Sequence, residues 1–268
     1  MTRSRLLDLI ALHRRRGRDA QGAFLVEGIR SVEAALDAHA PLDEIVVSDA
    51  VAAEPRVAAL VARATAPVSV VPARDAARIS DAQASQGVVA VARRIVVDAV
   101  PSGAERVLVL DGVQDPGNVG ALVRSAAWFG VDAVVSDARS ADPEGPKAVR
   151  AAMGGLWDVA LVRVAHLDAA LADLAAAGVA LWGADMDGTD AAAWAPDGPL
   201  ALVMGSEAHG LSPPVAARLD GRVSIARGAS IARGASMHRG AAPGTAPPGT
   251  ESLNVVVAAG VLLHRWLG

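Results

Sequence analysis

The chain has 268 residues, of which 52% are hydrophobic and 20% charged, so it is long enough for two small domains and can bury a sizeable core. Cysteine is absent, which excludes disulfides, thiolate nucleophiles and cysteine-ligated metals, and tyrosine is absent as well. The 25 basic and 29 acidic residues give a net charge of −4, which is not the balance of a chain that binds nucleic acid over its whole surface.

The first half alternates short helix and strand patterns. Helices are predicted where apolar residues recur at helical spacing, at 5–16, 29–38 and 54–65. Strands are predicted at 23–27, 44–47, 68–71 and 88–91. The stretch DAVPSGA carries proline and glycine between two apolar runs. We therefore place a linker at 98–104, between an N-terminal domain at 1–97 and a C-terminal domain at 105–268.

The second half restarts with a continuous apolar run at 106–110, typical of a strand that is covered on both faces. Further strands are predicted at 131–135, 179–182, 200–204 and 221–225. Helices are predicted at 119–129, 167–177, 212–218 and 253–267. This alternation predicts an α/β fold with a mostly parallel sheet, in which ligands lie beyond the carboxyl ends of the strands.

Three polar, glycine- or asparagine-bearing turns follow strands or open helices of this second half, at 115–118, 205–210 and 251–254. Gly117 and Gly120 would let the backbone approach a ligand, and Asn118 could cap the helix that follows. One such turn is usually only a tight connection. Three of them, carrying Glu207 and Asn254, favour a binding site, although their spacing does not say what binds.

Other features of the sequence exclude or weaken alternatives. Lys147 is the only lysine and no G-x-x-x-x-G-K precedes it, so a Walker-type phosphate loop is excluded. The six histidines lack metal-ligand spacing, so no metal is expected, and His209 is expected to be a solvated residue of its turn. No apolar run reaches about 18 residues and the N-terminus lacks a signal-peptide pattern, so we expect a cytoplasmic protein with no membrane partner.

Arginines gather in two stretches that could attract phosphate locally, although on charge alone a solvated surface is favoured. The first holds Arg3, Arg5, Arg14, Arg15, Arg16, Arg18 and Arg30, and the second holds Arg218, Arg222, Arg227, Arg233 and Arg239. The second overlaps a low-complexity insertion at 224–250, in which three hexamers (SIARGA, SIARGA, SMHRGA) precede APGTAPPGT. We favour a slippage-type expansion over a phosphate-binding loop.

The strings DPGNVGALVRSAAWFG, VMGSEAHGLS and ESLNVVVAAGVLLH, in this order, resemble the three motifs of the SpoU/TrmH family of RNA 2′-O-ribose methyltransferases, within the SPOUT superfamily. The resemblance covers about residues 106–268 apart from the insertion. The segment RRRGRDAQGAFLVEGIRSVEAAL is similar to the family's small RNA-binding domain of ribosomal-protein-L30-like (L30e-like) type. The resemblance implies a C-terminal parallel sheet with a deep trefoil knot that binds S-adenosylmethionine (AdoMet), and a homodimer whose interface includes the last helix.

The resemblance also implies the residues of the site. Its catalytic positions match Asn118, Arg124, Glu207, Ser252 and Asn254, and its cofactor-contacting positions match Gly205, Gly210, Ile225 and Leu253. The family's counterpart of Arg124 is proposed to assist deprotonation of the ribose 2′-hydroxyl. Because a guanidinium has a pKa above about 12, the alternative stays open that Arg124 remains cationic, anchors phosphate and stabilises the alkoxide.

The implied activity is methyl transfer from AdoMet to a ribose 2′-hydroxyl of rRNA or tRNA, with no DNA partner. The alternative is an RNA-binding protein of the same fold with weak or lost activity, because the insertion interrupts the implied cofactor pocket and Ile231 could take the place of Ile225. A nucleotide-dependent oxidoreductase is disfavoured, since the first turn reads D-P-G-N-V-G rather than G-x-G-x-x-G. Trp128 and Trp157 are expected in the core rather than as platforms for RNA bases.

Overall fold

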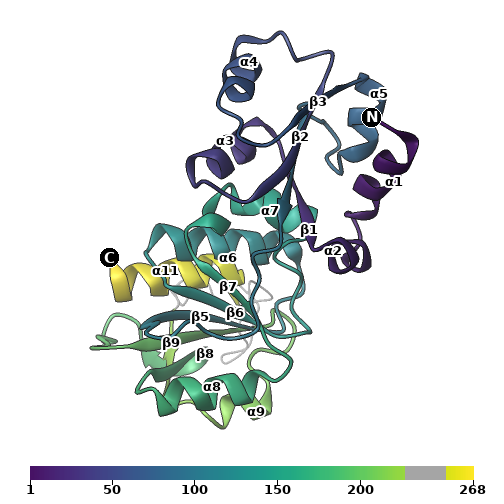
Figure 1. The fold of residues 1–268 in the computed structure, drawn as a ribbon. Coiled ribbons are helices and arrows are strands. Elements are labelled where there is room, and N and C mark those ends of the chain that lie inside the picture. Colours follow the sequence, from purple (N-terminus) through teal and green to yellow (C-terminus); the bar gives the residue numbers. More distant parts are fainter. Residues whose placement is uncertain (227–251) are drawn as a thin grey trace, which may run out of the picture.

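A four-stranded mixed sheet forms the centre of the N-terminal half of the computed structural model, which describes residues 1–226 and 252–268 (Figure 1). The strand order is β1-β4-β2-β3, with β4 antiparallel to both neighbours and β3 parallel to β2. The strands are β1 (Ala23–Glu27), β2 (Leu42–Ser48), β3 (Val68–Val71) and β4 (Val88–Arg93). The helices around them are α1 (Arg3–Ala11), α2 (Arg15–Gln21), α3 (Ile29–Asp37), α4 (Pro55–Ala62) and α5 (Ala73–Ile79).

A parallel sheet of six described strands forms the C-terminal half, in the order β10-β8-β9-β5-β6-β7. The strands are β5 (Arg106–Asp111), β6 (Ala133–Ser136), β7 (Ala160–Arg163), β8 (Ala180–Asp190), β9 (Leu200–Gly205) and β10 (Gly221–Ser224). The helices are α6 (Pro116–Trp128), α7 (Pro146–Ala152), the short 3-10 helix η1 (Gly155–Trp157), α8 (Leu167–Ala176), α9 (Pro213–Ala216) and α11 (Val255–Leu267). The predicted α/β class with a parallel sheet is confirmed.

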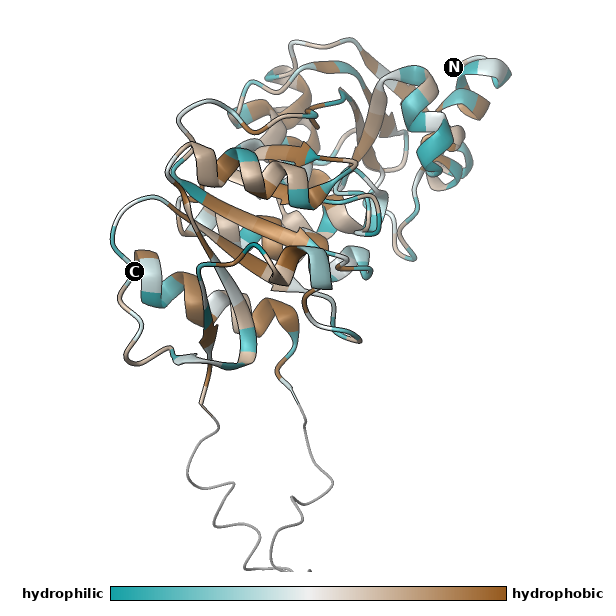
Figure 2. Ribbon diagram, turned by 90° about the horizontal axis from the view of Figure 1, so that it is seen from below, coloured by the Kyte–Doolittle hydropathy of each residue, from teal (hydrophilic) through white to brown (hydrophobic). Residues whose placement is uncertain are grey.

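Helices cover both faces of the parallel sheet, because its strands are apolar on both sides. In Figure 1, α6 and α11 lie side by side on one face, while α8 and α9 lie on the other. Figure 2 shows the same arrangement by hydropathy, with mostly hydrophobic strands inside. The core beneath α6 and α11 continues through α7 and η1 to the first sheet, where Phe24 stacks on Trp157 with ring centroids 6.0 Å apart.

The structure corrects the helix predicted at 5–16. The chain ends α1 at Ala11 and begins α2 at Arg15, and the two helices cross so closely that a Cβ on Gly17 would lie 2.0 Å from the carbonyl oxygen of Ala11. The turn between them is held by the ring of His13, whose Nε2 lies 2.7 Å from the carbonyl oxygen of Ile79. A tertiary contact with α5, which the sequence did not indicate, therefore decides where α1 stops.

The predicted insertion begins where β10 ends. Ser224 is the last residue of β10, and most of the insertion, with Ile231, lies outside the described residues. No helix among the described residues is long and apolar enough to cross a lipid bilayer.

Candidate active site

The loop after β5 leads into α6 through a capping arrangement that differs from the predicted one. Asp115, not Asn118, is the N-cap, and its Oδ1 accepts a hydrogen bond of 3.0 Å from the Asn118 backbone N–H. Lys147 donates to the other carboxylate oxygen at 2.7 Å. The hydrogen bonds from Lys147 and from the Asn118 backbone lower the pKa of Asp115. Because Asp115 caps the helix, the Asn118 side chain is available for other contacts.

The chain turns sharply after β9. Ser206 and Gly210 exchange two backbone hydrogen bonds, of 3.0 and 2.8 Å, which close a tight turn with Glu207 and His209 near its tip. Gly205 allows this closure, because a Cβ there would lie 2.3 Å from the carbonyl carbon of Gly210. Gly210 itself has φ +65°, a conformation that favours glycine.

The third turn ends at Asn254, the N-cap of α11, whose side-chain oxygen accepts from the Val256 backbone N–H at 2.9 Å. The Asn254 amide nitrogen donates to Asn118 Oδ1 at 3.4 Å, and Asn118 Nδ2 donates to Glu207 Oε1. We call these three residues the Glu207–Asn118–Asn254 chain. In the sequence, Glu207 lies 89 residues after Asn118 and Asn254 lies 136 residues after it, so the chain joins three distant segments.

The other predicted residues lie outside this hydrogen-bonded chain. Ser252 and Leu253 are exposed just before Asn254, and Ile225 is half-buried just after β10, against the large core. Arg124 is exposed on α6 and makes no hydrogen bond or ion pair with any residue in the described ranges. The structure therefore brings together Asn118, Glu207 and Asn254, and leaves the Arg124 side chain apart from them.

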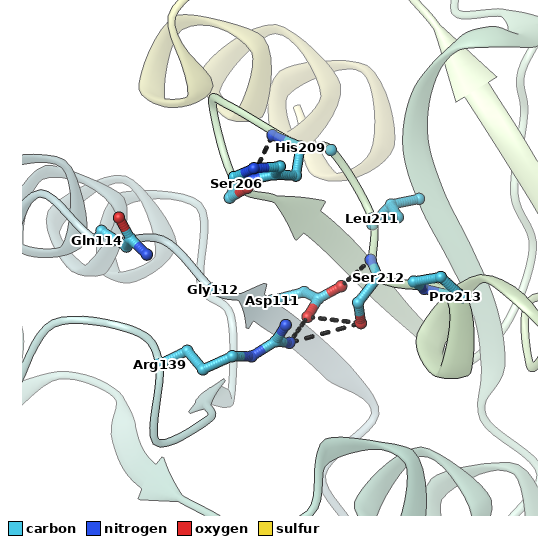
Figure 3. Close-up of a pocket in the computed structure, with 10 residues that line it drawn as sticks. Asp111, Gly112, Gln114, Arg139, Ser206, His209, Leu211, Ser212 and Pro213 are labelled. Carbon is cyan, nitrogen blue, oxygen red and sulfur yellow. Dashed lines mark hydrogen bonds and ion pairs between the residues drawn. The ribbon is translucent and has the colours of Figure 1, made fainter.

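A pocket of about 200 Å³ is lined by Ser206, His209 and the predicted Gly210 of the 205–210 turn, and by Asp111 and Arg139, which sequence reasoning missed (Figure 3). Buried Asp111, at the end of β5, accepts hydrogen bonds from Ser212 N at 2.6 Å and Ser212 Oγ at 3.0 Å. Arg139 donates to Asp111 through Nη2 and to Asp137 through Nε, the latter at 2.6 Å. These bonds tie the turn that carries Glu207 to the end of a central strand.

Asp137 is the second carboxylate that Arg139 binds. Burial works to raise the pKa of Asp137, but hydrogen bonds from Ser140 and Arg139 outweigh it, so the pKa lies below its usual range. In the sequence, the only indication of this cluster was that Asp111 and Asp137 lie at the ends of two adjacent strands, β5 and β6. Such residues are equally common in ordinary turns, so the pattern alone did not single them out. Within the described ranges, no three His, Asp or Glu side chains gather where they could hold a metal ion.

The sequence model of the SpoU rRNA methylase family matches residues 105–232. A solved structure assigned to the TrmH family of RNA methyltransferases, from Porphyromonas gingivalis, is 31% identical and covers 99% of this chain and 98% of its own, with a TM-score of 0.81. The chain belongs to the SpoU/TrmH family of RNA methyltransferases. The family match spans β5 to β10, the part of the chain that carries two of the three turns.

Two other comparisons cover almost the whole chain. RlmP of Bacillus subtilis, a 23S rRNA (guanosine(2553)-2′-O)-methyltransferase, is 28% identical over 96% of this chain and 93% of its own length. The SpoU methyltransferase AviRb of Streptomyces viridochromogenes, solved with AdoMet, is 24% identical with a TM-score of 0.81 over 98% of this chain and 97% of its own, a likeness of fold. Residues 4–90 match a model named for the MRM3-like substrate binding domain.

Proposed function

We propose that this protein transfers the methyl group of AdoMet to a ribose 2′-hydroxyl of rRNA or tRNA. The observation that carries the proposal is the Glu207–Asn118–Asn254 chain, which gathers the three motif segments at the carboxyl ends of parallel strands. RlmP, which aligns along nearly the full chain, is named as a 2′-O-methyltransferase of rRNA and supports the same specificity.

The described residues fit AdoMet. At Gly205 the turn packs backbone on backbone, against Gly210 and Leu211, and Gly210 lines the pocket of about 200 Å³. Main-chain amides and carbonyls in such a turn suit the polar edge of adenine and its ribose. Half-buried Ile225 and Leu253, which is 47% exposed, offer apolar surface to the ring. Glu207 brings a carboxylate, which favours a cationic sulfonium nearby. These residues, with Gly210, are the ones we propose to hold the cofactor.

AdoMet supplies a methyl group already activated by its positively charged sulfur, so the protein has to place the 2′-oxygen in line and assist loss of one proton. The bond from the methyl carbon to sulfur would break as the bond from that carbon to the 2′-oxygen forms, and the hydroxyl proton would pass to water. Ser252 and Asn254 offer hydroxyl and amide groups to orient the ribose, and Asn118 holds Glu207 in place. Arg124 is exposed on α6, and a guanidinium presents a planar fork of donors that suits phosphate. We therefore assign Arg124 the cationic role: it anchors the adjacent phosphate and stabilises the alkoxide.

The rest of the architecture is part of the same proposal. Residues 1–97 act as an L30e-like RNA-binding domain, joined by 98–104 to the methyltransferase domain at 105–268, and the match at 4–90 to a substrate-binding domain supports this. A deep trefoil knot is supported by the placement of α11, which returns from edge strand β10 to pack on α6 near the middle of the sheet. A cytoplasmic location belongs to the same proposal and is supported by the proposed rRNA or tRNA substrate.

A homodimer is supported by the outer face of α11. Leu253 precedes the helix, and Val257 and Val261 follow at four-residue spacing, with 47%, 52% and 43% of their surfaces exposed. An apolar stripe of this kind on a helix is typical of a subunit contact. We propose that a second copy of the chain covers it.

Labelled methyl transfer tests the proposed function. The protein is incubated with RNA and AdoMet carrying a deuterated methyl group, and the RNA is digested to nucleosides for mass spectrometry. We expect the label on ribose, and its loss in Arg124→Ala, whereas Arg218→Ala on the opposite face of the sheet keeps transfer. Label on a base, or full transfer by Arg124→Ala, would contradict the proposal.

A second function, RNA binding without methyl transfer, is favoured by one observation, the hexamer insertion between the second and third motifs. Calorimetry with AdoMet separates the two. Measurable AdoMet binding supports the enzyme, while RNA binding without AdoMet binding supports the second function.

A further inference from the structure

Trp128 is the most exposed large apolar side chain among the described residues, with 84% of its surface accessible at the end of α6. This corrects the expectation that Trp128 belongs to the core; Trp157 does pack against the core. The next residue, Phe129, is the one that turns inward and packs against the core. The chain has only 7 aromatic residues (5 Trp and 2 Phe), and the other four tryptophans are buried or half-buried.

Trp128 shares its exposed helix face with Arg124, one turn earlier on α6. The turn after α7 packs beside them: a Cβ on Gly155 would lie 3.1 Å from the Arg124 Cα. Met153, two residues earlier, has φ +53° and is 43% exposed. This conformation is that of the C-cap that ends α7, and it leaves the thioether side chain exposed.

The same turn reaches the N-terminal half of the molecule. A Cβ on Gly154 would lie 2.6 Å from the Cβ of Ala34 on α3, so the turn and α3 are in direct contact (Figure 1). Arg30 lies one helical turn before Ala34, is exposed, and has no ion pair within the described ranges. Its acidic neighbour Glu33 is held instead by Arg56, through two hydrogen bonds of 2.8 and 2.5 Å.

Four exposed side chains therefore lie on three segments that contact one another: α3, the turn after α7, and α6. We call this set the Arg30–Trp128 strip, made of Arg30, Met153, Arg124 and Trp128. It combines two cations without carboxylate partners, a flexible thioether and an indole. This is the chemistry that binds a single-stranded nucleic acid, in which phosphates pair with arginines and unstacked bases lie on aromatic rings.

We propose that the Arg30–Trp128 strip binds a single-stranded RNA segment next to the methylated nucleotide, with one base stacked on Trp128 and a phosphate at Arg30. The proposal rests on the proposed function, in which Arg124 faces the reacting ribose. A second copy of the chain is a poorer partner, because the strip carries two arginines and no carboxylate that could pair with them across a two-fold contact. The apolar stripe at Val257 and Val261 suits that role better.

Equilibrium binding without AdoMet tests the strip independently of methyl transfer. A fluorescent single-stranded RNA of about 12 nucleotides and a blunt duplex of the same length are titrated with full-length protein at several salt concentrations. For the single strand, Trp128→Ala should weaken binding about 5- to 150-fold with an unchanged salt slope, and Trp128→Phe should recover most of it. Arg30→Ala should reduce the salt slope by about 0.7. The affinity for the duplex should be the same in Trp128→Ala as in wild type.

Two matched controls lie away from the strip: Met186→Ala removes another exposed apolar side chain, at 74% exposure, and Arg218→Ala removes another exposed arginine. Both should bind as wild type. Unchanged binding by Trp128→Ala, an equal loss in the controls, or a change in oligomeric state of Trp128→Ala by sedimentation velocity would overturn the proposal. The last result would make the strip a subunit contact.

The outcome is separable from that of the proposed function. If the protein methylates ribose but the strip variants bind RNA as wild type, the strip fails and the function stands. If no methyl is transferred but single-stranded RNA binding depends on Trp128 and Arg30, the strip stands and the methyltransferase assignment fails.

Discussion

Asn118 uses both ends of its amide, donating through Nδ2 to Glu207 and accepting through Oδ1 from Asn254. Among side chains of this length only an amide can donate and accept in this way. The Asn118 side chain is free to do so because Asp115 caps α6 in its place. A single residue in the first turn of one helix thus couples the other two motif segments.

Asn118→Asp tests this coupling. The new carboxylate cannot donate to Glu207 and repels it, so the Glu207–Asn118–Asn254 chain should open. We expect kcat for methyl transfer to fall about 100-fold, and further than in Asn118→Ala, which removes the hydrogen bonds without adding a charge. The free energy of unfolding, measured by thermal denaturation, should stay within about 0.5 kcal/mol of the wild-type value, because the site is exposed. A wild-type kcat in Asn118→Asp would show that the Glu207–Asn118–Asn254 chain has no role in catalysis.

At the scale of elements, the turn at 205–210 is shaped by backbone packed on backbone. The Gly205 Cα faces the Gly210 carbonyl and the Leu211 amide so closely that a Cβ would lie 2.3 and 2.6 Å from them. The turn is further tied to β5 by Asp111, through both the backbone and the hydroxyl of Ser212. The position of Glu207 follows from these constraints.

Gly205→Ala should therefore push the turn away from β9. We expect a loss of about 1–3 kcal/mol of unfolding free energy by overpacking, together with AdoMet binding too weak to detect by calorimetry. The control is Gly198→Ala, before the amino end of β9, where φ is +82° and no atom lies within 4 Å of the new methyl group. It should lose about 1 kcal/mol through its backbone conformation but keep AdoMet affinity. Equal affinities for AdoMet in the two variants would contradict this account.

The helices and strands that follow hydrophobic periodicity were predicted from sequence, and those set by tertiary contacts were not. α3 and β5 have clear apolar patterns and were predicted within one or two residues. α7 (PKAVRAA) and β7 (ALVR) are too short for a period to emerge, and both depend on packing between the two sheets. Trp128 was misplaced for a related reason, since an apolar residue at the end of a helix does not reveal which way it faces.

The site residues also fall into two groups, those that local sequence patterns indicated and those that only tertiary contacts bring together. Turn chemistry alone indicated a binding site at 115–118, 205–210 and 251–254, and the structure brings side chains from all three segments together. The Asp111–Arg139 part of the pocket was missed because its residues interact only after β5, β6 and β9 are aligned. The catalytic and cofactor-contacting roles of all the predicted site residues, including Asn118, Glu207 and Asn254, stay predictions.

At the scale of the molecule, buried ion pairs join the two sheets. Arg18 of α2 pairs with Asp142 at 2.5 Å and donates to two carbonyl oxygens, and only 3% of its surface is exposed. Buried Glu144 accepts from Arg94 Nε at 2.6 Å and from two backbone N–H groups after β4. These bonds join the N-terminal half, which carries Arg30 of the proposed Arg30–Trp128 strip, to the C-terminal half, which carries the motif segments.

Asp142→Asn tests this connection. Burial works to raise the pKa of Asp142, but the Arg18 hydrogen bond and charge outweigh it and lower the pKa. The folded pKa lies below the unfolded value of about 3.9, so the stabilisation is present above that pH and is lost as pH falls through the folded pKa. We expect Asp142→Asn to lose about 2 kcal/mol of unfolding free energy at pH 7. The difference in unfolding free energy between this variant and wild type should become smaller below pH ~4.

The control for this experiment is Asp43→Asn, which breaks the more exposed pair with Arg93 and should change unfolding free energy by less than about 1 kcal/mol. Urea titrations at a series of pH values measure both variants. If the difference in unfolding free energy between Asp142→Asn and wild type grew as the pH fell, the account would be contradicted, because a carboxylate stabilised in its charged form loses that stabilisation at low pH.

Hydrogen–deuterium exchange with and without AdoMet tests the central claim most directly, namely that three distant segments form one cofactor site. We predict that AdoMet slows exchange together in peptides covering 112–120, 204–211 and 252–256, while the amides of α8 and of the first sheet exchange as before. Protection confined to one of these segments, or no protection at saturating AdoMet, would contradict the account.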